Sequence, residues 1–187
     1  QVLRDGEIAG HADLLAAARR TFLRRGFHQA SLEEIALAAG WSKGAVFSNF
    51  AGKDELFLAV LEEQNSRRRR EQIAEMRGAA TLAQALRAAG REMAGTHARD
   101  PQWTPLLVEF WTHASREEEL RRRVSAAHEQ LLDGYAAIVG ELAARDGLEF
   151  VAPVKAVCRS AAALARGLAL ERLLDPSAVP QPDFGEL

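Results

Sequence analysis

Ser42 has the surroundings of a catalytic nucleophile. It lies in the run GWSKG, Gly40–Gly44, which has the G-x-S-x-G form of a hydrolase nucleophile elbow. His97, His113 and His128 follow it, so a catalytic triad is one interpretation. The elbow needs a strand before the serine, however, and a helical pattern precedes it here. We therefore predict that the chain is not an enzyme, with a hydrolase using Ser42 as an alternative.

Lys43 and Asn49 suggest a different chemistry. Lysine donates to the acceptors of guanine in the DNA major groove, and asparagine suits adenine. Both residues belong to a short helix that follows Gly40 and carries Val46, Phe47 and Phe50 on its apolar face. This helix would present base-contacting side chains on its outer face.

The residues before Lys43 predict how this helix is positioned. Ser31 and Glu34 have the spacing of a capping box, which begins a helix. Gly40 ends that helix at a position that needs a positive φ, and Ser42 is placed to cap the next one. A helix, a tight glycine turn and a second short helix are typical of a helix-turn-helix, whose second helix enters the major groove.

Two further helices complete the predicted head. An apolar stripe begins at Leu14 and continues to Phe22 in a helix that we expect to end at Gly26. Another helix begins at Gly52 and Lys53. Three helices would share a small core, and the fourth would leave it.

Four runs of this region resemble the N-terminal signature of the TetR family of bacterial transcriptional regulators. They are Leu14–Phe27, Ser31–Gly40, Trp41–Gly44 and Phe50–Phe57, which together span about the first third of the chain. The resemblance implies an all-helical, homodimeric repressor that binds a palindromic DNA operator and responds to a small molecule. The alternative is a constitutive or activating DNA-binding regulator without a small-molecule ligand.

The resemblance and the major-groove argument together give a set of DNA-binding residues. The family places a phosphate-contacting lysine at the position of Lys53, whereas Asn49 and Phe47 depart from its usual histidine and tyrosine, so no operator sequence is implied. Ser31 is either a phosphate contact or only a helix cap, and Trp41 either packs in the core or covers a DNA sugar. The full set is Ser31, Trp41, Ser42, Lys43, Gly44, Ala45, Phe47, Ser48, Asn49 and Lys53.

The composition is that of an ordinary globular protein. Of its 187 residues 48% are hydrophobic, and no run has the ~20 apolar residues of a membrane span. Cys158 is the one cysteine, which fits a reducing compartment, and we expect a cytoplasmic protein. The net charge is −2, and residues 1–65 hold seven Lys/Arg against nine Asp/Glu. Attraction to DNA must therefore depend on where the charges lie.

The remaining sequence predicts helices only. We expect an all-α fold of about eight or nine helices, with a DNA-binding domain at 8–52, an effector-binding and dimerisation domain at 53–176, and a tail at 177–187. Four arginines, Arg67–Arg70, favour a solvated helix in which they pair with nearby glutamates, with a second DNA contact as the alternative.

An effector pocket is expected in the C-terminal domain. Aromatic and apolar residues with few polar groups typically line such pockets, although each could equally belong to an ordinary core. We expect a mid-sized hydrophobic or aromatic effector, no metal and no cofactor. The predicted lining is Met93, Trp103, Leu107, Phe110, Trp111, His113, Leu131 and Tyr135.

The last predicted helix, from Val154 to about Asp175, carries an apolar stripe with many small residues. Packing within one chain and packing between subunits both fit this stripe. The resemblance favours the second, because the family's dimers are built from the last two long helices. The predicted dimer residues are Val124, Val157, Cys158, Ala161, Leu164, Ala165 and Leu168.

Overall fold

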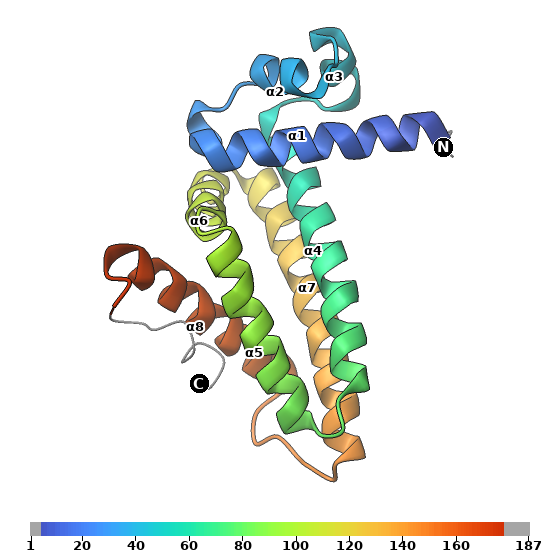
Figure 1. Ribbon diagram of the computed structural model, residues 1–187, viewed down its shortest axis with the longest axis vertical. Coiled ribbons are helices and arrows are strands. Elements are labelled where there is room, and N and C mark those ends of the chain that lie inside the picture. Colours follow the sequence, from blue (N-terminus) through green and yellow to red (C-terminus); the bar gives the residue numbers. More distant parts are fainter. Residues whose placement is uncertain (1–4, 178–187) are drawn as a thin grey trace. The chain divides into compact units, whose positions relative to one another are not determined.

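The computed structural model describes residues 5–177 and confirms the predicted all-α fold (Figure 1). Within these residues there are eight helices and no strand. The predicted tail lies outside the described residues from position 178 on. The helices are α1 Asp5–Gln29, α2 Leu32–Ala39, α3 Lys43–Asn49, α4 Lys53–Gly78, α5 Leu82–Arg99, α6 Trp103–Ala114, α7 Glu118–Arg145 and α8 Val154–Leu174.

The described chain divides into two compact units. The first contains the residues up to Gln64 together with Leu106–Val124, and the second contains Asn65–Pro105 and the residues from Ser125 on. Helices α4 and α7 each begin in the first unit and end in the second. The C-terminal half of the sequence therefore contributes part of α6 and the start of α7 to the unit that holds the helix-turn-helix.

In the first unit, α1 packs on α2 and α2 packs on α3 (Figure 1). Leu14, Ile35 and Val46, one from each of these helices, are fully buried together with residues of α4. A cluster of aromatic rings extends this core, and the ring centroids of Phe57 and Phe110 are 4.3 Å apart. Removal of this apolar surface from water is the main stabilising contribution to such a core.

Helix α1 is interrupted at Gly26, where its first, long segment was predicted to end. Gly26 has φ 76° and ψ 170°, a conformation that is almost confined to glycine, and one more turn leads to Gln29. A Cβ at Gly26 would lie 2.9 Å from Oε2 of Glu109, so a side chain there would displace this carboxylate.

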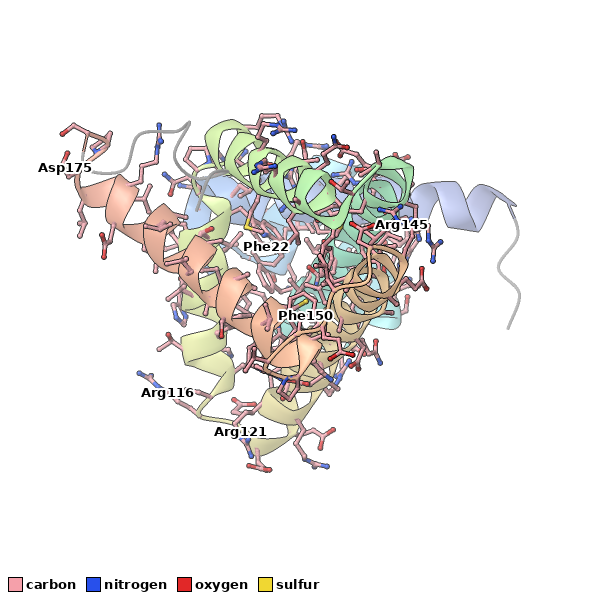
Figure 2. The ribbon with its side chains drawn as sticks, turned by 90° about the horizontal axis from the view of Figure 1, so that it is seen from below. Phe22, Arg116, Arg121, Arg145, Phe150 and Asp175 are labelled. Atoms are coloured by element: carbon pink, nitrogen blue, oxygen red, sulfur yellow. The ribbon has the colours of Figure 1, made fainter. Side chains whose placement is uncertain are left out.

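The second unit has a core at the ends of α4 and α7 and the starts of α5 and α8. Met76, Leu82, Ile138 and Leu142 are buried there, and Phe150 packs against them from the segment before α8 (Figure 2).

Asp146, directly after α7, fixes one junction of this core. Its Oδ2 accepts the backbone N–H of Leu82 at 2.5 Å, at the start of α5. This hydrogen bond is the main reason why the pKa of the Asp146 carboxyl lies below its usual value, with a smaller contribution from the side chain of Arg145. The other partner of Arg145 is the carbonyl of Ala79, to which its Nη1 donates at 3.0 Å.

Two arginines of α4 reach residues of other segments in the second unit. Arg68 pairs with Asp100 at 3.7 Å and lies over the ring of Trp103, and Arg69 donates to the carbonyl of Gln130. We expected pairs with glutamates along the same helix. These contacts of Arg68 and Arg69 are with residues of other segments in the second unit, and the pairing with glutamates stays a prediction.

Candidate nucleic-acid interface

The two short helices of the helix-turn-helix are capped as the sequence predicts. The Oγ of Ser31 accepts the N–H of Glu34, and the Oγ of Ser42 accepts the N–H of Ala45, both at 3.1 Å. Gly40 has φ 70° and ends α2, as a left-handed residue at this position should. Short-range hydrogen bonds therefore fix where α3 begins.

The capping box at Ser31 is completed only in part. We expected the carboxylate of Glu34 to return to the cap. Instead, Oε1 of Glu34 accepts hydrogen bonds from Arg24 at 2.8 Å and Arg25 at 3.3 Å. These two α1 guanidinium groups are thus partly neutralised on the surface of the head. The hydrogen bond from Arg24 is the largest cause that lowers the pKa of Glu34.

Helix α3 buries one face and exposes the other. Val46 is buried, and Phe50 is buried directly after the helix. The predicted DNA-contacting residues of α3 are exposed, except for the half-buried Ala45. Phe47 was expected on the apolar face with Val46 and Phe50, and this is wrong: its ring is 46% exposed and lies on the outer face of α3.

Two polar side chains of α3 are bound to its own backbone. The Oγ of Ser48 donates to the carbonyl of Ala45 at 2.9 Å, and the Nδ2 of Asn49 donates to the same carbonyl at 2.8 Å. This hydrogen bond uses the Nδ2 of Asn49 and not its Oδ1, which is the acceptor that adenine needs.

Lys43, the first residue of α3, forms an ion pair with Glu33 of α2. Its Nζ lies 2.5 Å from Oε1 of Glu33 and 5.6 Å from the centroid of the Phe47 ring. The hydrogen bond from Lys43 is the largest cause of the lowered pKa of Glu33. Sequence reasoning selected Lys43 and missed Glu33, although its place in the first turn of α2 marks it as exposed.

Lys53, predicted as a phosphate contact, holds the end of α1. Its Nζ donates to the carbonyls of His28 at 2.9 Å and Ala30 at 3.1 Å, and it lies 4.7 Å from the centroid of the Phe27 ring. An ammonium has three donors, so one remains for another acceptor. Lys53 could therefore contact a phosphate while it keeps its two hydrogen bonds to the end of α1.

Trp41 packs against α1. A Cβ on Gly10 would lie 3.3 Å from Cζ2 of Trp41, so the indole covers this glycine and is itself half-buried. Nearby in the sequence of α1, the ring of His11 is stacked on Phe50 with a centroid distance of 5.6 Å.

Glu109 is a functional candidate that sequence reasoning did not select. It belongs to α6, and its carboxylate accepts the backbone N–H groups of Phe27 and His28, each at 2.9 Å. These amides follow the interruption at Gly26, where the helical hydrogen-bond pattern is broken. The available signal was that Glu109 is the one acidic residue in the apolar run Trp103–Ala114.

His113 reaches the start of α4 from the same helix. Its Nε2 lies 2.9 Å from Oδ1 of Asp54, and its ring contacts the ring of Phe27 with a centroid distance of 5.0 Å. Together with Glu109, this places two polar side chains of α6 on α1 and α4.

The eight predicted pocket residues are divided between the two units. Leu107, Phe110, Trp111 and His113 belong to the first unit, and Met93, Trp103, Leu131 and Tyr135 to the second. Phe110 is fully buried among the aromatic rings of the first unit. This burial favours the alternative that Phe110 packs in an ordinary core instead of lining a pocket.

A polar pair lies in the interior of the second unit. The hydroxyl of Tyr135 donates to Oε1 of Gln72 at 2.5 Å, and Nε2 of Gln72 donates to the carbonyl of Ala89. Burial raises the pKa of Tyr135 to about 12, against smaller opposite effects of Arg68 and Arg69. Gln72 of α4 thus links Tyr135 of α7 to the backbone of α5.

The predicted dimer residues differ in how much surface they expose. Val124 and Ala165 are buried within their own chain and have little surface left for a partner, Val157, Cys158 and Leu168 are half-buried, and Ala161 and Leu164 are exposed. An ion-pair network joins α7 to α8, in which Glu129 meets Lys155 at 2.9 Å and Arg159 at 2.7 Å. These contacts lower the pKa of Glu129 to about 2.

Among residues 5–177, no helix is long and apolar enough to cross a membrane.

Two family models match the chain. Residues 14–60 match "Bacterial regulatory proteins, tetR family", and residues 82–184 match "BetI-type transcriptional repressor, C-terminal". Among curated relatives, the transcriptional activator FasR of Mycolicibacterium smegmatis is 49% identical over 49 residues, which are 26% of this chain and 22% of FasR. The transcriptional repressor AcnR of Corynebacterium efficiens is 35% identical over 63 residues, 34% of each chain. The matches thus span between about a fifth and a third of these relatives.

Solved structures share the fold over nearly the whole chain. The regulator FadR from Bacillus subtilis, in complex with stearoyl-CoA, has a TM-score of 0.77 and 15% identity, with 94% of this chain and 93% of FadR covered. A putative regulator from Saccharomonospora viridis, in complex with choline, has a TM-score of 0.71 and 18% identity, with 94% and 91% covered. With the capped helix-turn-helix and the two family-model matches, these findings establish that the chain belongs to the TetR family of DNA-binding transcriptional regulators.

Proposed function

We propose that this regulator is a homodimeric repressor that binds a palindromic operator and is released from it by a small molecule. The observation that carries the DNA-binding part is the exposed face of α3, whose start is fixed by the Ser42 cap and whose first residue is Lys43. In a helix-turn-helix, the N-terminal residues of the second helix contact base edges. A protein of this architecture reads DNA with residues 8–52 and uses residues 53–176 for the effector and the partner subunit.

The proposed dimer rests on the surface of α8. Leu164 is 53% exposed and Leu174 is 89% exposed, and the same helix adds two small exposed positions, Ala161 and Gly167. Exposed apolar surface of this kind is typical of an interface, and most homo-oligomers are two-fold symmetric dimers. Two symmetry-related recognition helices read half-sites about 34–36 Å apart, one turn of DNA.

The proposed effector binds in the second unit, near Met93, Trp103, Leu131 and Tyr135. Related folds have been solved with stearoyl-CoA and with choline. Here the ring of Trp103 already has the guanidinium of Arg68 above it, 5.6 Å from its centroid. A resident cation on that ring disfavours a second cation such as choline. The other residues named are mostly apolar or aromatic and favour a ligand with an apolar body, which the chain of an acyl-CoA supplies.

The proposed mechanism is a shift between two populations of the dimer. The effector must bind the DNA-incompetent arrangement more tightly, because equal affinity for both arrangements would shift nothing. Helix α4 runs in the sequence from Lys53, at the head, to residues of the second unit. Glu109 and His113 of α6 contact α1 and α4, so a displacement of α6 changes the support of the head.

The experiment is selection of binding sites from random duplex DNA, followed by gel-shift titration of the selected site. We expect a palindrome with a steep salt dependence, and release by a long-chain acyl-CoA but not by choline or free coenzyme A. Asn49→Ala should relax the preference at particular bases, whereas Lys53→Ala should weaken binding to all sequences about equally. A selected site that no effector releases would favour the constitutive regulator. No enriched site would contradict operator binding itself.

A further inference from the structure

We infer that Glu33 and Lys43 act together as one base-reading unit, which recognises a G·C pair in each half-site of the operator. The inference rests on the operator binding proposed above. It adds Glu33, an acidic residue, to the specificity-determining residues of the head.

The pair joins the first turns of the two helices of the helix-turn-helix. Glu33 is the second residue of α2 and Lys43 is the first residue of α3, and their charged atoms are 2.5 Å apart. Both side chains are more than half exposed. The N-terminal residues of a recognition helix are the ones that reach base edges, so the pair lies where base contacts are made.

The scaffold does not need this ion pair. Buried Ile35 and Val46 pack α2 and α3 in the core, and the N–H of Trp41 donates to the carbonyl of Ala36 across the turn at 2.9 Å. Exposed ion pairs contribute little to stability. A carboxylate near DNA repels phosphates, so Glu33 does not favour DNA binding in general.

A lysine–glutamate pair is complementary to one base pair in particular. In the major groove, G·C presents two acceptors on guanine, N7 and O6, followed by the N4 donor of cytosine. The ammonium of Lys43 suits the acceptors and the carboxylate of Glu33 suits the donor. O6 and N4 are themselves hydrogen-bonded and so lie about 3 Å apart, close to the 2.5 Å between Nζ and Oε1.

An A·T pair fits less well. Its one donor, adenine N6, lies between the acceptors N7 of adenine and O4 of thymine. A carboxylate that accepts from N6 would face an acceptor on each side, and the ammonium could meet only one of them. The pair therefore discriminates by repulsion as well as by attraction.

The test uses the full-length protein and the operator obtained by selection. Each G·C pair of the half-site is replaced in turn by A·T and by C·G, and affinity is measured by gel shift at fixed salt. For wild type, one position should show a loss of about tenfold on replacement, as expected for a specific base contact. N4-methylcytosine at that position, which replaces the major-groove hydrogen of the amino group, should cause a similar loss.

Glu33→Ala and Glu34→Ala form a matched pair of variants. Both remove one negative charge from α2, but Glu34 pairs with Arg24 and Arg25 and not with α3. Glu33→Ala should reduce the preference at the G·C position to about twofold or less and should be insensitive to N4-methylcytosine. Glu34→Ala should keep the wild-type preference. Thermal unfolding of each variant checks that the head is folded.

Two outcomes would overturn the inference. In the first, Glu33→Ala binds every sequence more tightly by the same factor, which would make Glu33 only a restraint on Lys43. In the second, Glu33→Ala keeps the G·C preference, so that Lys43 reads the base pair alone. Failure to select any operator with the wild-type protein is a separate result, which would contradict the proposed operator binding before the pair is probed.

Discussion

The carboxylate of Glu109 accepts the backbone N–H of Phe27 at 2.9 Å, although the two residues are 82 positions apart in the sequence. The same carboxylate accepts the N–H of His28. At Gly26 the helix is interrupted, so these two amides need acceptors outside their own helix. A side chain of α6 thus completes the hydrogen bonding of α1.

This relationship predicts that Glu109 stabilises the first unit. Glu109→Ala should lower the free energy of unfolding by about 2 kcal/mol, because two backbone donors lose a charged acceptor. Glu109→Gln keeps one acceptor oxygen and should lose about half as much. Urea unfolding measures both, with Glu117→Ala as the exposed control, for which a change within about 0.5 kcal/mol is expected. A Glu109→Ala variant as stable as wild type would show that water replaces the carboxylate.

Two glycines with positive φ should respond differently to alanine. Gly40, with φ 70° and ψ 22°, is left-handed and has open space around it, so Gly40→Ala should cost about 1 kcal/mol. Gly26, with ψ 170°, is in a region almost closed to other residues, and a Cβ there meets Glu109. Gly26→Ala should cost about 3 kcal/mol. Thermal unfolding of the two variants measures both losses of stability. Equal losses would contradict the prediction that Gly26→Ala is the more destabilising change.

Glu129 should contribute to acid stability. Its hydrogen bonds from Lys155 and Arg159 lower its pKa to about 2, from its ordinary value of about 4.5. A depressed folded-state pKa stabilises the protein above the unfolded-state pKa, and this contribution is lost as the pH falls from about 4.5 to about 2. The unfolding midpoint in urea, followed over this range, should fall less steeply in Glu129→Gln than in wild type. Parallel wild-type and Glu129→Gln profiles would disprove the role of Glu129.

Tyr135 is the one tyrosine of the chain, so its ionisation can be observed directly. Burial raises its pKa to about 12. The ultraviolet absorbance of tyrosinate should therefore appear near pH 12, rather than near the usual ~10. Since the neutral form is favoured in the folded state, stability should decline as the pH rises above about 10. A titration midpoint near 10 in the folded protein would show that the ring is accessible to water.

The parts of the fold that depend on neighbouring residues were predictable. Ser31, Gly40 and Ser42 act on amides or dihedral angles within a few positions, and the structure places each in its predicted local role. The start of α5 depends on a neighbouring residue in the same way, because the Oγ1 of Thr81 accepts the backbone N–H of Gln84 and so caps the helix. Short-range chemistry of this kind is independent of the rest of the fold.

Contacts across long sequence separations were not predictable. No sequence pattern indicates that Arg69 ends on the carbonyl of Gln130, or that Glu109 caps the amides after Gly26. The predicted pocket illustrates the same limit. Trp103 and Phe110 share one apolar helix, yet they belong to different units, because the boundary between the units falls within α6.

The structural role of Lys53 limits which residues can replace it, although it is also a predicted DNA contact. Its compact ammonium donates to two carbonyls, those of His28 and Ala30, while it lies against the ring of Phe27. The donors of an arginine are fixed in one plane and cannot be redirected in this way. Drift from lysine to arginine, harmless at many phosphate contacts, would disturb the end of α1 here. Descendants of this sequence are therefore expected to retain lysine at position 53 even when they diverge to new operators.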